Sequence, residues 1–82
     1  MSTNNALVTM SHLNMDTVRT MMSFVMSSRA SYQKGDGTHS KIIEHNEIAF
    51  NKRFSSDADE LAHLEHNGYI RRVPGHIYIR LA

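Results

Sequence analysis

Histidine is the residue type with the most evident chemical potential in this chain, which has six histidines and no cysteine in 82 residues. His63 and His66 are three residues apart, so on a helix both imidazoles would lie on one side and could share an ion with His76 or Glu65. A zinc centre also needs a third ligand placed by the fold and partners that orient the imidazoles. The sequence shows neither, so we expect solvent-facing histidines, no metal and no cofactor.

Other motifs that mark catalysis do not occur in the sequence. There is no thiol nucleophile, no glycine-rich phosphate loop and no nucleophile elbow, and Gly35-Asp36-Gly37 is too short and isolated to cradle a phosphate. The acids at positions 57–60 suit the positive end of a helix better than a pair of catalytic carboxylates. The sequence therefore predicts a protein that is not an enzyme.

Charge is distributed unevenly along a chain whose formal net charge is only +1. Residues 69–82 contain three bases, Arg71, Arg72 and Arg80, and no acid. Residues 41–66 contain three bases and six acids, namely Lys41, Lys52 and Arg53 against Glu44, Glu47, Asp57, Asp59, Glu60 and Glu65. The chain thus joins an acidic helical section to a basic segment whose guanidinium groups match phosphate oxygens.

The elements that must position these groups begin with a helix expected over residues 14–28, which Asn14 or Asp16 can cap. Its inward face is indicated by apolar residues at three- and four-residue steps, namely Met15, Val18, Met21, Met22, Val25 and Met26. The two glycines around Asp36 favour an exposed loop over residues 31–37.

Two further helices are expected before the basic segment. The second covers residues 40–51, with Ser40 as its cap and an inward face formed by Ile42, Ile43 and Ile48-Ala49-Phe50. The third covers residues 56–67, because Ser56 and Asp59 form a capping pattern and Asn67-Gly68 supplies a stop. Its inward stripe is expected at Ala58, Leu61 and Leu64.

A β-hairpin is expected over residues 69–81, where apolar and polar residues alternate around Pro74-Gly75. Proline sets φ at the first central position of a type II turn, and glycine provides the positive φ of the second. This alternation predicts that Ile77, Ile79 and Leu81 face the core, while His76, Tyr78 and Arg80 face outward.

The length of the chain favours one domain over residues 1–82, in which residues 1–13 are frayed or form a short extra element. The sequence has no signal-peptide pattern and no apolar run long enough to span a bilayer, so we expect a cytoplasmic protein without a membrane partner. The methionine-rich first helix is expected to form core and the contact of a homodimer.

The order helix, turn, helix and hairpin, with Leu61-x-x-Leu64-x-x-x-Gly68-Tyr69-Ile70-Arg71-Arg72, resembles the winged helix-turn-helix family of bacterial and phage regulators. The likeness covers about half of the chain, from His39 to Ala82. It implies an α+β fold of three helices and a C-terminal two-stranded wing. It also implies that the third helix enters the major groove of duplex DNA and that the wing touches phosphate.

Carried over residue by residue, the resemblance assigns nucleic-acid contacts to Lys52, Arg53, Ser55, Ser56, His63, Asn67, Arg71, Arg72, His76, Tyr78 and Arg80. The acids of the third helix depart from the family pattern, because carboxylates facing a duplex are repelled by its phosphates. Two functions therefore remain open. One is a small transcriptional regulator that binds DNA. The other is a phage-type inhibitor or adaptor that binds a protein partner through an acidic face formed by Asp57, Asp59, Glu60 and His63.

Overall fold

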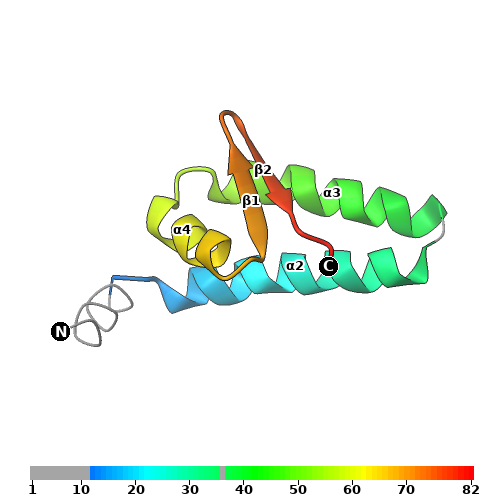
Figure 1. Cartoon of the computed structure of the whole chain (residues 1–82), viewed down its shortest axis with the longest axis horizontal. Helices are drawn as coiled ribbons and strands as arrows, with labels where there is room; N and C mark the ends of the chain where they lie inside the picture. Colours follow the sequence, from blue (N-terminus) through cyan, green and yellow to red (C-terminus); the bar gives the residue numbers. More distant parts are fainter. Residues whose placement is uncertain (1–11, 36) are drawn as a thin grey trace.

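The computed structural model describes residues 12–35 and 37–82, which form three helices and one two-stranded antiparallel sheet (Figure 1). The elements are α2 (Met15–Lys34), α3 (Gly37–Phe54), α4 (Ala58–His66), β1 (Ile70–Val73) and β2 (His76–Ile79). This α+β layout, helices first and hairpin last, is consistent with a winged helix-like fold. The expectations for residues 1–11 and for Asp36 lie outside the described residues.

Helix α2 begins where the sequence predicted and ends later. The Asn14 side chain caps it by accepting hydrogen bonds from the amides of Asp16 and Thr17. The expected loop over residues 31–37 is wrong for residues 31–34, which continue the helix, and for Gly37, which begins α3. Gly35, with a φ of 71°, ends it and donates its N–H to the carbonyl of Ser31. The glycine pattern placed the turn correctly, but it could not show that Ser31 is buried at 7% exposure.

Helix α3 is longer than the expected 40–51 and turns a different face inward. Ser40 lies inside the helix, so it is not its cap. Ile42 and Ile48 are 39% and 57% exposed, which corrects their expected inward position. The buried face carries Asn46, Phe50 and Phe54, and the Asn46 amide donates to the hydroxyls of Ser27 and Ser28 at 3.1 Å. A buried polar network therefore sets the register of α3 on α2.

Helix α4 begins after the expected cap. Its N-cap is Asp57, which makes no side-chain capping bond, and Ser56 is exposed in the preceding turn, so the expected capping pattern is not formed. Ala58 is also exposed, which leaves Leu61 and Leu64 as the buried apolar residues of the helix. Gly68 has a φ of 78°, in agreement with the predicted stop.

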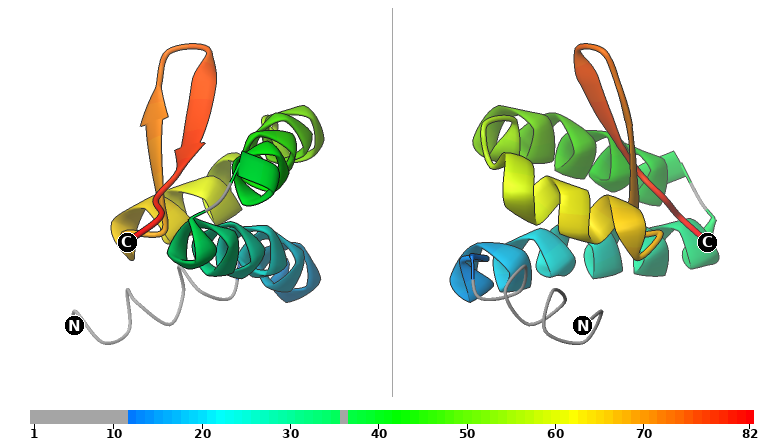
Figure 2. Two further views of the ribbon diagram at one scale, coloured as in Figure 1. Left: turned by 90° about the vertical axis from the view of Figure 1, so that its right-hand side faces the viewer. Right: turned by 60° about the vertical axis from the view of Figure 1, so that its left-hand side comes forward.

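The hairpin has the predicted register, with Val73 opposite His76 and Arg71 opposite Tyr78. Gly75 has a φ of 81°, as the second position of the predicted turn requires. Both views in Figure 2 show the turn of the hairpin standing out beyond the helices. The inward-facing Ile77 and Ile79 are buried and Leu81 is half-buried, as expected.

The core lies where α2, α3, α4 and the inner face of the hairpin meet. Three phenylalanine rings, Phe24, Phe50 and Phe54, pack edge to face with centroids 4.9–6.1 Å apart. Met15 and Met26 are 43% and 54% exposed, so they do not belong to the buried stripe expected for the first helix. The buried apolar residues are Val18, Met21, Val25, Phe50, Phe54, Leu61, Leu64, Ile70, Ile77 and Ile79.

Candidate nucleic-acid interface

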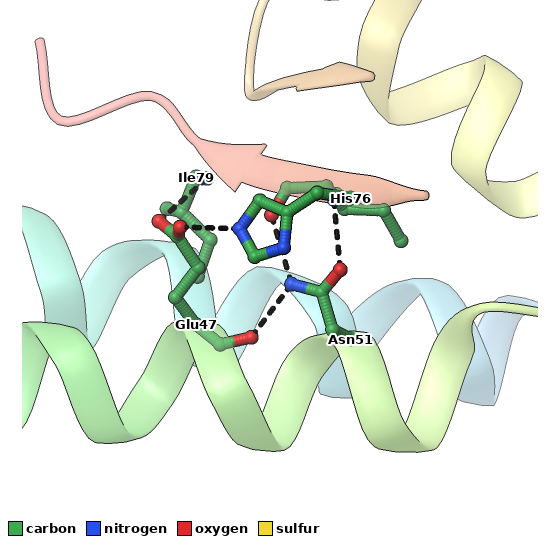
Figure 3. Close-up of polar contacts among 5 residues, drawn as sticks. Glu47, Asn51, His76 and Ile79 are labelled. Carbon is green, nitrogen blue, oxygen red and sulfur yellow. Dashed lines mark hydrogen bonds and ion pairs between the residues drawn. The ribbon is translucent and has the colours of Figure 1, made fainter. Parts of the chain in front are cut away.

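The outer edge of β2 is bound by a side chain of α3 instead of by a third strand. Asn51 accepts the N–H of Ile77 at 2.7 Å and donates to the carbonyl of Ile77 at 2.8 Å (Figure 3). Hydrogen-bonded and non-hydrogen-bonded pairs alternate in an antiparallel hairpin. Because Val73 and His76 flank the turn as a bonded pair, the backbone groups of Ile77 point away from β1. Asn51 therefore supplies the two bonds that a neighbouring strand would have made.

Glu47, one helical turn before Asn51, extends this attachment along β2. Its Oε2 accepts the N–H of Ile79 at 3.4 Å, and its Oε1 lies 2.8 Å from Nε2 of His76 (Figure 3). His76 is consequently half-buried and bonded to α3, not simply outward-facing as predicted. The hairpin position is fixed relative to α3 along the whole of β2.

The base of the hairpin is held by Arg29 of α2. Its Nε donates to the carbonyl of Arg80 at 2.8 Å, and its guanidinium lies 5.3 Å from the centroid of the Tyr69 ring. A second donor of the same side chain reaches the carbonyl of Gly68 at 3.4 Å. Arg29, Glu47 and Asn51 were not singled out from the sequence. For the last two, the available signal was a pair of polar residues four positions apart on one helix face.

The outward face of the hairpin, here called the wing face, consists of Arg71, Val73, His76 and Tyr78, which alternate with the inward residues. The guanidinium of Arg71 lies over the Tyr78 ring at 4.6 Å from its centroid. The ring of His76 packs against the same tyrosine with a centroid distance of 4.5 Å. Arg71 is exposed and Tyr78 is 38% exposed, so this planar cluster is accessible to a ligand.

Lys52 extends the wing face onto α3. It lines an open hollow together with Ile48, Asn51, Ser55, Gly75 and His76, so Lys52 lies beside the hairpin turn. Arg80 follows β2 at the other end of the hairpin, where its N–H donates to the carbonyl of Tyr69 and its side chain is exposed. Lys52 and Arg80 therefore stand at opposite ends of the wing face.

Arg72 belongs to the opposite side of the hairpin. Its Nε and a terminal nitrogen both donate to Oε1 of Glu65 on α4, at 3.0 and 2.9 Å. The side chains are 34% and 41% exposed, so the pair is a partly screened surface contact. This contact occupies the guanidinium that the sequence had assigned to phosphate, and it neutralises one of the α4 carboxylates.

The other acids around α4 do not form a single face. Glu60 is 8% exposed and accepts the N–H of Asn14 at 3.0 Å, so it joins α4 to the start of α2. Asp57 lines a hollow with Arg53 on the α2 side, whereas Asp59 lines a different hollow on the outer side of α4. The expected acidic partner-binding face is therefore dispersed over three environments.

The outer side of α4 has a shallow hollow lined by His12, Asp59, Ala62, His63 and His66. Helix α4 itself contains no lysine or arginine. A helix that reads the major groove normally places such donors against bases and phosphates. The outer side of α4 therefore lacks the cations with which a helix in the major groove contacts DNA, in line with the departure from the family pattern noted in the sequence.

The remaining residues assigned to nucleic acid are scattered. Arg53 lies over the Phe54 ring, 5.3 Å from its centroid, and faces away from the wing face. Asn67 donates its side-chain amide to the carbonyl of His63, one helical turn back. Ser55 and Ser56 are exposed in the turn between α3 and α4. The structure thus brings together Lys52, Ser55 and His76, and separately Arg71, His76 and Tyr78.

His63 and His66 line the outer hollow of α4, whereas His76 is bonded to Glu47 on α3, so these three imidazoles do not converge. Within residues 12–35 and 37–82, no group of three or more His, Cys, Asp or Glu side chains is arranged to hold a metal ion. Among the helices in the described part of the chain, none combines the length and apolar character needed to cross a membrane.

Comparison of the chain with protein-family models, with curated proteins and with solved structures found no match in any of the three.

Proposed function

We propose that the protein binds nucleic acid through the wing face and its flanking cations, as a small transcriptional regulator with a winged-helix layout. The observation that carries this proposal is the state of the cations around the hairpin. Lys52, Arg71 and Arg80 are all exposed, and in the described part of the chain none of them has a carboxylate partner. Exposed cations without carboxylate partners, placed on and beside one hairpin, are suited to phosphate contacts.

The positions of the acids remove the main objection to this proposal. Four carboxylates near α4 could have repelled a polyanion, but Glu60 is buried and Glu65 is paired with Arg72. Asp57 lies beside Arg53 on the α2 side. Only Asp59 remains on the outer side of α4, and it is separated from the hairpin turn that Lys52 adjoins. Repulsion from the α4 acids is therefore smaller than the sequence suggested, and Glu47, the carboxylate that contacts the wing face, is bonded to His76 and to the N–H of Ile79.

The direct test is fluorescence anisotropy with labelled duplex DNA of random sequence, measured from about 50 to 200 mM salt. We expect the logarithm of the association constant to fall linearly with the logarithm of salt concentration. Lys52→Ala and Arg80→Ala should each weaken binding to all sequences and reduce the slope by about 0.9, the value for one phosphate contact. Lys34→Ala is the matched control, because Lys34 is exposed in the last turn of α2 and belongs neither to the wing face nor to its flanking cations. An unchanged salt slope in both alanine variants, or no binding of either the duplex or its separated single strands at the lowest salt, would contradict the proposal.

The alternative, a protein that binds a protein partner, is favoured by one observation. The outer hollow of α4 presents Ala62 between three imidazoles without a lysine or arginine, which suits a neutral or weakly polar partner surface better than phosphate. Ala62→Arg fills this hollow with a long cationic side chain at an exposed helical position, where the fold tolerates it. If the partner surface is on α4, this variant loses a complex that Arg71→Ala retains. The opposite pattern excludes α4 as the partner site.

A further inference from the structure

The wing face carries three planar side chains in contact with one another. Arg71 and Tyr78 are directly opposite each other across the two strands, and His76 lies two residues before Tyr78 on the same side of β2. The guanidinium-to-ring and ring-to-ring distances of 4.6 and 4.5 Å join them into one cluster. Such a cluster offers flat, polarisable surfaces on the outward face of the hairpin, whose turn stands out beyond the helices (Figure 2).

The structural value of this cluster is small. An exposed cation–π pair stabilises a protein only slightly, and cross-strand pairs contribute to a similar extent. The hairpin already has stronger attachments in Asn51, Glu47 and Arg29. Arg71 and Tyr78 are therefore not needed to hold the hairpin in place. Binding of a flat ligand would explain why their planar groups are exposed.

The chemistry of the surroundings identifies the class of ligand. Unpaired bases stack on aromatic rings and on arginine guanidinium planes, whereas bases inside a duplex are stacked on each other and are not accessible to a flat platform. Lys52 adjoins the hairpin turn next to His76, and Arg80 follows Tyr78 toward the base of the hairpin. A strand lying along the hairpin would therefore meet a cation, the planar cluster and a second cation in succession.

We propose that the wing face is a stacking platform for an unpaired base, so that single-stranded nucleic acid is the preferred ligand of this protein. This inference rests on the proposed nucleic-acid function and names its substrate class. Arg71 extends the stack from Tyr78 outward, and Lys52 and Arg80 contact the phosphates on the two sides of the stacked base. The lack of lysine and arginine on α4 agrees with this proposal, because the helix that would enter the major groove of a duplex has no cationic side chains to contact its bases or phosphates.

The test compares a labelled short oligothymidine, the matching oligouridine, and a duplex of the same length by fluorescence anisotropy at one salt concentration. The wild-type protein should bind at least one single strand more tightly than the duplex. Tyr78→Leu should weaken single-strand binding by about 5- to 150-fold, the range for loss of one stacked base, and leave duplex binding unchanged. Tyr78→Phe, which keeps the ring, should retain most of the affinity.

Tyr32→Leu is the matched control, because Tyr32 is another exposed tyrosine, at 53%, and lies in the last turn of α2. Its single-strand affinity should equal that of the wild type. Circular dichroism of each variant checks that the fold is intact. Duplex binding equal to or tighter than single-strand binding, or an unchanged affinity in Tyr78→Leu, would overturn the platform while leaving nucleic-acid binding in place. No binding to any of the three probes would overturn the proposed function itself.

Discussion

Replacing Asn51 by alanine is expected to detach β2 from α3 and to lower the stability of the whole domain. The side chain makes two bonds with the backbone of Ile77 and a third with the carbonyl of Glu47. Ile77 is only 6% exposed, so water replaces these bonds poorly. Leaving a buried donor or acceptor unpaired costs about 1–3 kcal/mol. For each of the two backbone groups of Ile77 we take the lower part of that range, about 1–1.5 kcal/mol, which gives about 2–3 kcal/mol in total.

Alanine also forms helices more readily than asparagine, which offsets up to about 0.7 kcal/mol of the lost stability in α3. The expected net loss is therefore about 1.5–2.5 kcal/mol, equivalent to a fall in Tm of about 6–20 °C for a domain of this size. Thermal and urea unfolding followed by far-ultraviolet circular dichroism measure it. Asn67→Ala is the control, since its amide donates to one carbonyl at an exposed helix end and its loss should cost less than about 0.5 kcal/mol. Equal losses in the two variants would refute the assignment of Asn51 as the edge partner of β2.

Three further substitutions test the contacts that place the candidate site. Glu60→Gln should lower stability by about 1–2 kcal/mol in urea unfolding, because it weakens the hydrogen bond from the N–H of Asn14, the cap of α2. Asp59→Asn is the control and should change the stability little. Equal effects of the two substitutions would show that Glu60 is not structural. Arg29→Met should selectively increase hydrogen exchange at the base of the hairpin, and uniform acceleration throughout the domain would argue against a local clamp. Phe50→Ala should cost about 3–5 kcal/mol, because its ring is fully buried between two others, and a loss below about 1 kcal/mol would contradict that packing.

The elements that the sequence predicted correctly are those determined by local chemistry. Asn14 caps α2 because its side chain reaches amides two and three residues away, and Gly68 and Gly75 adopt positive φ because the backbone must turn there. Alternation around Pro74-Gly75 was enough to place Ile77 and Ile79 in the core. Each of these features depends on a few neighbouring residues, so a single sequence contains the necessary information.

The elements that were wrong depend on contacts between distant segments. The residues around Ser31 in the sequence do not show whether it lies in a loop or in a buried part of a helix. Its burial arises from contacts made where the chain folds back on itself. The same holds for α3, whose exposed Ile48 and buried Asn46 reverse the usual preference. The serines of α2 that Asn46 contacts are 18 and 19 positions away, which periodicity within one helix does not reveal.

The candidate site was only partly predictable for a related reason. Composition located the basic hairpin, but it could not show that Arg72 forms an ion pair with Glu65 while Arg71 is stacked on Tyr78. Both arginines are adjacent in sequence, and strand geometry sends them to opposite faces. In the same way, Glu60 and Asp59 are neighbours on α4, yet one is buried and the other is exposed. The net charge of each face depends on which side chains each helix and strand turns toward it, and only the assembled fold determines that orientation.

The measurement that tests the central claim most directly is an NMR titration of uniformly labelled protein with a short oligonucleotide. If nucleic acid binds the wing face, the largest changes in amide chemical shift occur in the hairpin from Arg71 to Tyr78 and at Lys52, and they weaken as salt is added. Shifts confined to the outer side of α4, around Ala62 and His66, or the same pattern at all salt concentrations, would contradict the account.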